Sequence, residues 1–351
     1  MLYFQNDYNI GCHPKILDAM ISGNNTPNPG YGADEICKKA ADLIRAACEH
    51  RELDVHFLVG GTQTNLTVIA ASLRPHQAVI AAESAHIEVH ETGAIENTGH
   101  KVLPLPSLDG KIRAEQIDSY VTAHFLDETA EHMAQPKMVY ISTPTELGTI
   151  YSLEELRQIR RICDQKGLLL FLDGARLGYG LEANGNDVTL KDLAELCDVF
   201  YIGGTKVGAL FGEAVVIRNA AIADDFRYLM KQHGAMLAKG WLLGVQFVTL
   251  FQDNLYFEIS KHANLLADKL RNRIRAIGFS LLTQTTTNQV FAVFPDALLE
   301  RLKESVLYSY QCRVDEDHSA VRFCTSWATK ESDVESLCDI LTKLANECAC
   351  S

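Results

Sequence analysis

Lys206 stands in a setting that suits covalent chemistry. It follows an apolar run, residues 198–202, and the sequence GGT. A second apolar run, residues 168–172, leads directly into Asp173, with Arg176 shortly after it. An amine nucleophile, a carboxylate at a strand end and a nearby guanidinium are the groups needed to bind and tune pyridoxal phosphate. The three residues therefore predict a site for that cofactor.

A glycine turn could complete such a site. Gly60 and Gly61, followed by Thr62 and Gln63, separate a predicted strand from a helix that we expect to start near Leu66. Backbone N–H groups at the start of a helix bind phosphate well. The turn is not a Walker-type loop, because no Gly-Lys-Ser/Thr follows it.

His86 follows the next predicted strand and offers an imidazole at the same sheet edge. With His90 it has the i, i+4 spacing of a metal pair, but no third ligand with helical spacing accompanies the two, so we expect no metal. Taken singly, Asp-Gly after a strand is usually a turn, and a lone lysine is usually on the surface. Their order along one sheet favours a shared site.

The composition narrows the class of protein. The chain has 351 residues, of which 47% are hydrophobic and 22% charged, as in a globular enzyme that is long enough for two domains. A formal net charge of −13 argues against a basic face for nucleic acid. The most apolar later stretch, residues 235–251, is interrupted by Lys239 and glycines. It predicts a buried helix and not a membrane span.

The cysteines indicate a reducing compartment. The chain has 10 of them, and none belongs to a C-x-x-C pair. Free cysteine in apolar surroundings behaves as a small hydrophobic residue. Because the N-terminus shows no signal-peptide pattern either, we expect a cytoplasmic location.

Short apolar runs alternate with amphipathic ones through residue 217. Ser152 and Glu155 form the capping-box start of a helix that we expect to end at Gly167. The predicted strands are residues 55–60, 78–82, 138–142, 168–173, 198–202 and 213–217. This alternation predicts an α/β fold whose large domain has a mostly parallel sheet flanked by helices, with functional side chains at strand ends.

The pattern changes after Ile217, and it predicts a second, smaller domain. Residues 220–278 are mainly helical, and a last helix is expected at residues 330–349. Predicted strands between them are residues 279–283, 289–294, 311–315 and 320–325. We therefore expect an N-terminal arm at 1–30 near the active site or subunit interface, a large cofactor-binding domain at 31–245, and a small C-terminal α+β domain at 246–351.

Two sequence runs are specific enough to indicate a family. They are residues 171–177 (FLDGARL) and 204–212 (GTKVGALFG); Asn6-Asp7, residues 29–32 (PGYG) and residues 322–327 (RFCTSW) fit the same pattern. Over nearly its whole length the chain resembles the threonine aldolases of the β-eliminating lyase group. Those enzymes have the aspartate-aminotransferase-like fold of pyridoxal-phosphate enzymes.

The resemblance implies a role for the residues around the cofactor ring. Lys206 would bind pyridoxal phosphate covalently, with Thr205 beside it also in contact with the cofactor. Asp173 would pair with the pyridine nitrogen, which makes the ring an electron sink. His86 would stack on the face of the ring.

The resemblance also implies how phosphate and substrate are held. Gly61, Thr62 and Gln63 would cradle the phosphate of the cofactor. Arg176 would reach the phenolic oxygen of the cofactor or the carboxylate of the substrate. Arg322 would bind that carboxylate with two parallel hydrogen bonds.

Two positions depart from the family pattern. Asn6 stands where relatives commonly have a serine near the substrate carboxylate. Many members have a second active-site histidine in the loop after the third predicted strand, and Thr145 occupies its place here. A neutral threonine cannot act as a base, so either His86, Glu146 or a bound water would take that role, or the substrate range differs. Thr145 and Glu146 are both expected to line the substrate site.

The expected activity is that of a carbon–carbon lyase of the low-specificity L-threonine aldolase type. It would cleave L-threonine or L-allo-threonine to glycine and an aldehyde. One alternative is a β-eliminating lyase acting on a cysteine-like or tyrosine-like amino acid, and another is a non-catalytic protein that retains the fold. The resemblance also implies a homo-oligomer, a dimer or a dimer of dimers with shared active sites, to which residues 4–31 could contribute.

Overall fold

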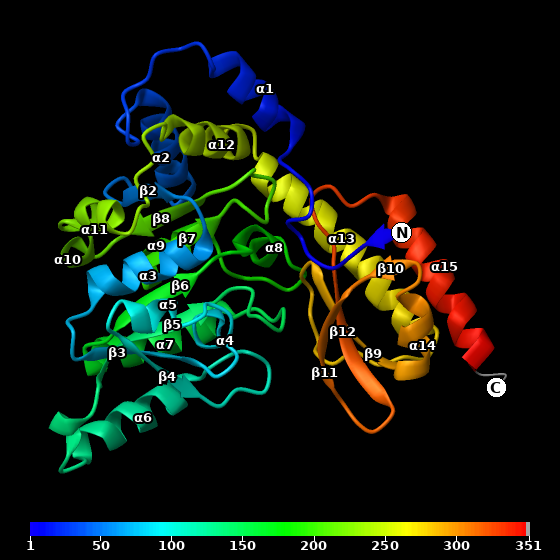
Figure 1. Cartoon of the computed structure of the whole chain (residues 1–351). Coiled ribbons are helices and arrows are strands. Elements are labelled where there is room, and N and C mark those ends of the chain that lie inside the picture. The colour runs from blue at the N-terminus through cyan, green and yellow to red at the C-terminus, as the bar shows by residue number, and fades with distance from the viewer. Residues whose placement is uncertain (349–351) are drawn as a thin grey trace.

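The computed structural model describes residues 1–348, which form a large α/β body and a smaller α+β body (Figure 1). The long helix α13 (Leu255–Ala276) runs between them. Each body has its own core of buried apolar side chains, and the second core contains residues from α13 onward together with Phe4 of the N-terminal arm. The division of the chain at residues 30 and 245 stays a prediction; residue 245 lies inside α12 (Trp241–Gln252).

The large body contains a seven-stranded sheet with the order β2-β8-β7-β6-β5-β3-β4. Only β8 runs antiparallel to its two neighbours, so the predicted mostly parallel sheet is confirmed. Its strands are β2 (Asp54–Leu58), β3 (Gln77–Ala82), β4 (Lys101–Leu105), β5 (Gln135–Ser142), β6 (Leu169–Asp173), β7 (Val199–Gly203) and β8 (Glu213–Ile217). Strands β3, β7 and β8 are buried along their whole length, which explains their continuous apolar sequences.

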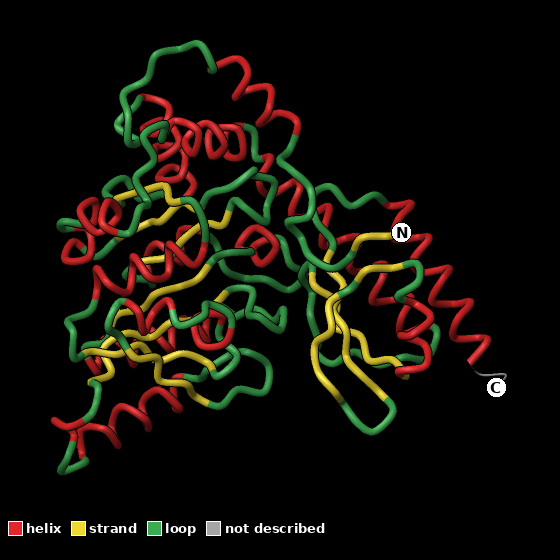
Figure 2. The backbone as a smooth tube through the Cα atoms, viewed as in Figure 1, coloured by secondary structure: helices red, strands yellow, loops and turns green. Residues whose placement is uncertain are grey.

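Helices cover this sheet and connect its strands (Figure 2). Helix α7 begins at the predicted capping box, with the Ser152 hydroxyl and the Glu155 carboxylate each accepting from the other residue's backbone N–H, and it ends at Gly167 with φ 64°. The helices of this body are α1 (Pro14–Gly23), α2 (Glu35–Ala47), α3 (Gly61–Ser72), α4 (His86–Val89), α5 (Ala94–Asn97), α6 (Ala114–Leu126), α7 (Leu153–Lys166), α8 (Leu177–Leu181), α9 (Leu190–Leu196), α10 (Ala220–Ala223), α11 (Phe226–Gln232) and α12. A short 3₁₀ turn, η1 (Ala130–His132), precedes β5.

One helix of this body starts earlier than predicted, and one strand was not predicted. Helix α3 starts at Gly61 and not near Leu66, because the amide of Thr64 already donates to the carbonyl of Gly60 at 3.0 Å. Strand β4 escaped prediction because Pro104 interrupts its apolar pattern. The strand lies at the edge of the sheet, where proline is tolerated.

The small body has a three-stranded antiparallel sheet with the order β11-β12-β9, covered by α13, α14 (Asp296–Leu302) and α15 (Glu331–Cys348). Strands β9 (Gln289–Pro295) and β12 (His318–Cys324) lie close to their predicted positions. Strand β11 (Ser309–Arg313) ends two residues earlier than expected, because the chain already turns at Val314, whose amide donates to the carbonyl of His318 at 3.0 Å.

The strand predicted at residues 279–283 is wrong. Within the described chain, this segment makes only an isolated bridge, between Leu281 and Ala292. The chain leaves the sheet here because Thr283, at the end of the segment, and Thr287, beyond it, bond to the large body instead. The hydroxyl of Thr283 donates to the carbonyl of Leu147 at 3.0 Å, and that of Thr287 donates to Gly148 at 3.1 Å.

The N-terminal arm ties the two bodies together. Its strand β1 (Leu2–Tyr3) pairs with β10 (Val306–Leu307), which the sequence analysis did not predict. Farther along the arm, the amide of His13 donates to the carbonyl of Gly208, just after Lys206, at 2.8 Å. The arm therefore passes close to the predicted covalent lysine. Among residues 1–348, no helix combines the length and apolarity that crossing a membrane requires.

Candidate active site

A cavity lies at the carboxyl ends of β5, β6 and β7. This is the sheet edge at which the sequence placed the chemistry, as is common in open α/β sheets. It brings together many of the residues predicted for the site. Its lining consists of Gly61, Asn65, His86, Ser142, Pro144, Thr145, Glu146, Asp173, Ala175, Arg176, Tyr201 and Lys206.

Two glycines allow the loops that carry Asp173 and Lys206 to touch. A Cβ atom on Gly174 would lie 1.9 Å from the carbonyl oxygen of Tyr201, and one on Gly203 would lie 2.3 Å from that of Ala175. The two backbones are joined directly, since the amide of Gly203 donates to the carbonyl of Gly174 at 2.9 Å. Any larger residue would push the carboxylate and the amine apart.

The carboxylate of Asp173 is held by donors from three directions. The hydroxyl of Tyr140 donates to Oδ2 at 2.5 Å, the amide of Asn65 donates to the same oxygen at 3.1 Å, and the backbone N–H of Ala175 donates to Oδ1 at 2.9 Å. Burial, together with the negative charge of Asp173, raises the pKa of Tyr140 well above its usual value, so that the phenol remains a donor. The orientation of Asp173 is therefore fixed.

The amine of Lys206 lies buried at the cavity. Burial and the positive charge of Arg176 lower its pKa, which favours the neutral, reactive form. Within residues 1–348, the amine makes no hydrogen bond or ion pair, while the carbonyl of the same residue accepts from the hydroxyl of Tyr179 at 2.6 Å. Nearby, burial raises the pKa of Glu213 to about 8, and this side chain accepts from the amide of Gly204 at 3.1 Å.

His86 is the first residue of α4, and its ring lines the cavity. Its Nδ1 lies 2.8 Å from Oε1 of Glu91, a carboxylate whose side chain is 0% exposed. Its backbone N–H donates to Oε1 of Glu146 at 3.0 Å, and the hydroxyl of Ser142 donates to the same oxygen at 2.8 Å. Burial, with a contribution from Asp173, raises the pKa of Glu146.

Thr145, in place of the family histidine, is bound to its own loop. Its hydroxyl lies 2.7 Å from that of Thr149, which donates in turn to the carbonyl of Asp109 at 2.7 Å. Gly110 packs directly against it, because a Cβ there would lie 2.6 Å from the threonine Oγ1. Thr145 therefore forms a wall of the cavity.

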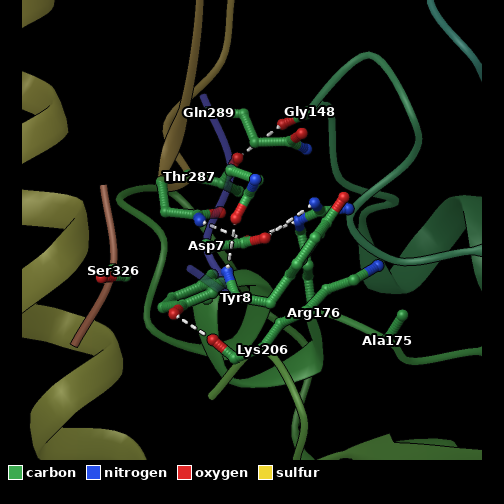
Figure 3. Close-up of polar contacts among 12 residues, drawn as sticks. Asp7, Tyr8, Gly148, Ala175, Arg176, Lys206, Thr287, Gln289 and Ser326 are labelled. Carbon is green, nitrogen blue, oxygen red and sulfur yellow. Dashed lines mark hydrogen bonds and ion pairs between the residues drawn. The ribbon is translucent and has the colours of Figure 1, made fainter. Parts of the chain in front are cut away.

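Arg176 forms a buried ion pair with Asp7 of the N-terminal arm (Figure 3). Its Nε and one terminal nitrogen donate to the two carboxylate oxygens at 2.7 and 2.9 Å, a bidentate arrangement. Asn288 donates to Oδ2 of Asp7 as well, at 2.9 Å. Burial acts against ionisation of Asp7, but the guanidinium outweighs it and lowers the pKa of the carboxyl below its ordinary 3.8.

Replacing Asp7 with asparagine should destabilise the fold by about 3–5 kcal/mol, because it leaves the buried Arg176 guanidinium without a counter-charge. A lowered pKa in the folded state means that the carboxylate stabilises the fold above pH 3.8, and that this contribution is lost as pH falls below that value. Thermal melting from pH 7 to pH 3 should show a gap between wild type and variant that is constant at high pH and closes in acid. Asp18→Asn, on the exposed face of α1, is the control. An equal gap at pH 3 and pH 7 would contradict the ion-pair account.

The predicted phosphate cradle lies at the start of α3. Gly61 lines the cavity, and Thr62 is exposed beside it. The side chain of Gln63 points elsewhere: it accepts from the amide of Val59 at 3.2 Å and donates to the carbonyl of His233 at 3.1 Å. Only the backbone N–H of Gln63 is therefore left for a phosphate. The hydroxyl of Thr205 accepts from the amide of Gly212 at 3.0 Å.

Two predicted substrate-binding residues lie outside the lining of this cavity. Asn6 accepts from the amide of Tyr8 at 3.1 Å and lines a separate hollow together with Tyr3 and Ser326. Arg322 lies on β12, where one terminal nitrogen donates to Oε1 of Gln289 at 3.2 Å. Its Nε is buried without a hydrogen-bond partner among the described residues, and its charge helps to lower the pKa of His90, after burial and His86.

A comparison with family models places this site in a known group. The model of the beta-eliminating lyases matches residues 11–297, well over half of the chain. The chain belongs to the beta-eliminating lyase family. The matched segment contains both Asp173 and Lys206, the two groups around which the cavity is built.

Individual members of the family are similar over nearly the full length. A low specificity L-threonine aldolase of Pseudomonas sp. (strain NCIMB 10558) is 31% identical over 337 residues, 95% of each chain. The solved structure of Leishmania major threonine aldolase matches with a TM-score of 0.96 and 46% identity, covering 98% of this chain and 100% of that one. Aspartate aminotransferase from Thermus thermophilus, at 15% identity and a TM-score of 0.72 over 98% of this chain and 91% of that one, shows the shared fold alone.

The structure of this beta-eliminating lyase adds residues in contact with the site that the sequence did not single out. Asp7 was noted only as part of a motif, and Asn65 had no assigned role. Tyr140 lay inside a predicted strand, and Glu91 lay in a segment without any motif. A signal existed for Asp7, since a carboxylate next to a motif residue is a candidate partner for a buried arginine. For Glu91 no sequence signal existed.

Proposed function

We propose that this chain catalyses the retro-aldol cleavage of L-threonine, L-allo-threonine and related β-hydroxy-α-amino acids to glycine and an aldehyde. The observation that carries the proposal is the convergence of Lys206, Asp173 and His86 in one cavity. The similar proteins at 31% and 46% identity are threonine aldolases by name, which supports this substrate class. The enzyme would be a lyase that uses pyridoxal phosphate bound to Lys206.

The residues of the cavity fit this cofactor. The amine of Lys206 has a lowered pKa, as attack on an aldehyde requires, and Asp173 offers a fixed carboxylate for a ring nitrogen. The first N–H groups of α3, from Gly61 onward, have no partner within their own helix and suit a phosphate. When bound, pyridoxal phosphate supplies an electron sink for the charge that develops as a bond to Cα breaks.

The remaining contacts can be assigned from the free donors. Arg176 uses Nε and one terminal nitrogen for Asp7, so its other terminal nitrogen is left for the phenolic oxygen of the cofactor or the substrate carboxylate. Thr205 next to Lys206 and the backbone N–H groups of Thr62 and Gln63 complete the cofactor contacts in this proposal.

We assign the proton transfer to His86. The hydroxyl of Thr145 is held by Thr149, and Oε1 of Glu146 already accepts two hydrogen bonds. Among the described residues, the ring of His86 makes a hydrogen bond only through Nδ1, so Nε2 can accept the proton of the β-hydroxyl group. Thr145 and Glu146 then shape the space around the β-substituent.

A product assay tests the reaction class. Purified enzyme with added pyridoxal phosphate is offered L-threonine, L-allo-threonine, phenylserine and a cysteine conjugate in separate reactions. Glycine with the matching aldehyde from the hydroxy amino acids is the expected result. Pyruvate and ammonia from the cysteine conjugate, without glycine from the others, would instead establish a β-elimination activity.

Arg322 is the proposed anchor of the substrate carboxylate, supported by its buried Nε without a partner. We expect Arg322→Lys to raise KM for L-threonine roughly 10- to 100-fold, because a hydrogen bond between charged groups contributes about 1.5–3 kcal/mol and lysine cannot reproduce the bidentate geometry. Steady-state kinetics provide the measurement, with Arg313→Lys on the exposed end of β11 as the control. An unchanged KM with a lowered kcat would assign Arg322 to another role.

We further propose a homo-oligomer, a dimer or a dimer of dimers, in which the arm at residues 4–31 lies near a neighbouring site. Exposed apolar side chains on this arm support the idea, among them Tyr8, Ile10, Leu17 and Ile21. Light scattering coupled to gel filtration gives the mass, and a monomer near 38.9 kDa would contradict the proposal. A cytoplasmic location is supported by the eight cysteines whose side chains are described, all of them free.

A further inference from the structure

His86 and Glu91 form a pair on the wall of the active-site cavity. His86 starts the short helix α4, and Glu91 follows the helix and turns back beneath the ring. The contact joins Nδ1 to Oε1 at 2.8 Å. The histidine side chain is 37% exposed, whereas the glutamate side chain is 0% exposed. The pair therefore has one member open to the cavity and one sealed behind it.

Asn65 connects this pair to the carboxylate at the centre of the site. Its side-chain nitrogen donates to Oε1 of Glu91 at 2.8 Å and to Oδ2 of Asp173 at 3.1 Å. Both N–H bonds of the amide are thus directed at carboxylates, one for each. The buried chain of contacts runs from His86 through Glu91 and Asn65 to Asp173.

This arrangement of buried polar groups is unfavourable for the stability of the fold. Burial of a carboxylate is unfavourable unless its lone pairs are satisfied, and the second oxygen of Glu91 has no hydrogen-bond partner among the described residues. The carbonyl oxygen of the Asn65 side chain lacks a partner as well. An apolar pair would fill the same space without that cost. The buried carboxylate of Glu91 is therefore expected to serve the chemistry of the site.

The requirement follows from the chemistry of imidazole. A carboxylate only accepts hydrogen bonds, so the contact obliges Nδ1 of His86 to carry the proton. The other ring nitrogen, Nε2, is then the one with a free lone pair, on the side open to the cavity. Without Glu91, both tautomers would be populated and the ring could rotate.

We propose that Glu91 is a positioning residue that fixes the tautomer and orientation of His86, with Asn65 holding Glu91 in place. The effect of this arrangement on catalysis rests on the proposed function. Nε2 takes the proton of the substrate β-hydroxyl group, and the electron pair of that O–H bond becomes the second bond of the aldehyde carbonyl. The pair of the breaking C–C bond stays with the carbon that becomes Cα of glycine, which is then reprotonated. During the step the imidazolium is stabilised by the negative charge of Glu91.

Glu91→Gln is the first test, because glutamine keeps the shape and removes the charge. We expect kcat for L-threonine to fall roughly 10- to 100-fold, as is typical when a group that orients a catalytic residue is removed. KM should stay within a factor of about 2, since Glu91 does not touch the substrate. Glu88→Gln, on the exposed face of the same helix, should leave both constants unchanged. Unchanged kcat in Glu91→Gln overturns the proposal.

A double-mutant comparison shows whether Glu91 acts through His86. If it does, Glu91→Gln should have no further effect in a His86→Gln background, so the double variant should match His86→Gln alone. An equal loss of kcat in both backgrounds would mean a general structural role and would refute the inference. Thermal melting of each variant verifies that the fold is retained.

A third readout needs neither substrate nor cofactor. In the cofactor-free protein labelled with ¹⁵N-histidine, the ring ¹⁵N chemical shifts distinguish the two neutral tautomers, and the signals that are missing in His86→Gln are those of His86. We expect the tautomer with the proton on Nδ1 in wild type and a mixture of both tautomers in Glu91→Gln. The other charged or titratable groups near the ring are His90, Glu146, Asp173, Arg176, Lys206 and Arg322, and they are the same in both proteins.

The three tests separate this inference from the proposed function. If wild type released no glycine from any β-hydroxy amino acid, the proposed function would fail, while the ¹⁵N signals would still report the His86–Glu91 contact. If glycine were released but the tautomer of His86 were the same in wild type and Glu91→Gln, the inference would fail and the proposed function would stand.

Discussion

Lys206→Ala is expected to eliminate glycine formation from L-threonine, with a loss in kcat of roughly 10⁴-fold or more, as for other enzymes deprived of their nucleophile. The physical reason is that the only amine lining the cavity, within the described chain, is removed. A lysine with a lowered pKa is also the group that would hold an aldehyde cofactor covalently. The variant should therefore lose the visible absorbance that borohydride reduces in the wild type.

The control for this experiment is Lys191→Ala. That lysine lies on the surface, paired with Glu49, and its loss should leave turnover and absorbance unchanged. Retention of the borohydride-reducible absorbance in Lys206→Ala would show that another lysine holds the cofactor. The assignment of the site would then have to move, although the fold and family would be unaffected.

The sequence predicted best those strands of the sheet that are buried on both faces. Residues 213–217 were predicted to be a strand and are β8 with the same bounds, because every side chain in it is apolar or enclosed. Strand β4 was missed at the sheet edge, where a proline is tolerated and the apolar pattern is weak. The segment at residues 279–283 has strand-like residues, but its threonine, Thr283, bonds to a loop more than a hundred positions away. The local sequence pattern cannot predict a hydrogen bond to so distant a segment.

The candidate site likewise contains residues that could be predicted from the sequence and residues that could not. Lys206 and Asp173 could be found because each follows a recognisable strand and glycine turn. Asp7 could not be paired with Arg176, because the two residues are 169 positions apart and meet only when the arm folds across the large body. Asn65 reaches Asp173 over 108 positions for the same reason. Sequence therefore identified the reactive groups, whereas the residues that orient them emerged only from the structure.

The second large effect is expected for Asp173→Asn, which changes charge without changing shape. Three donors converge on the carboxylate, from Tyr140, Asn65 and the amide of Ala175. An asparagine carbonyl can accept from two of them at most, and its NH₂ group must face a remaining donor. The side chain would therefore lose its fixed orientation as well as its charge.

The consequence for catalysis should be a fall in kcat of roughly 10²- to 10³-fold, the size typical when one preorganised partner of a developing charge is removed. Asp253→Asn changes an exposed carboxylate at the C-terminal end of α12, outside the cavity lining, and this control should behave as wild type. Absorbance spectra of the variants, recorded with a titration of pyridoxal phosphate, separate loss of cofactor from loss of chemistry. A variant that retains full kcat would show that Asp173 only supports Tyr140 and Asn65. The role of pairing with the pyridine nitrogen of the cofactor would then belong to a different group in the cavity.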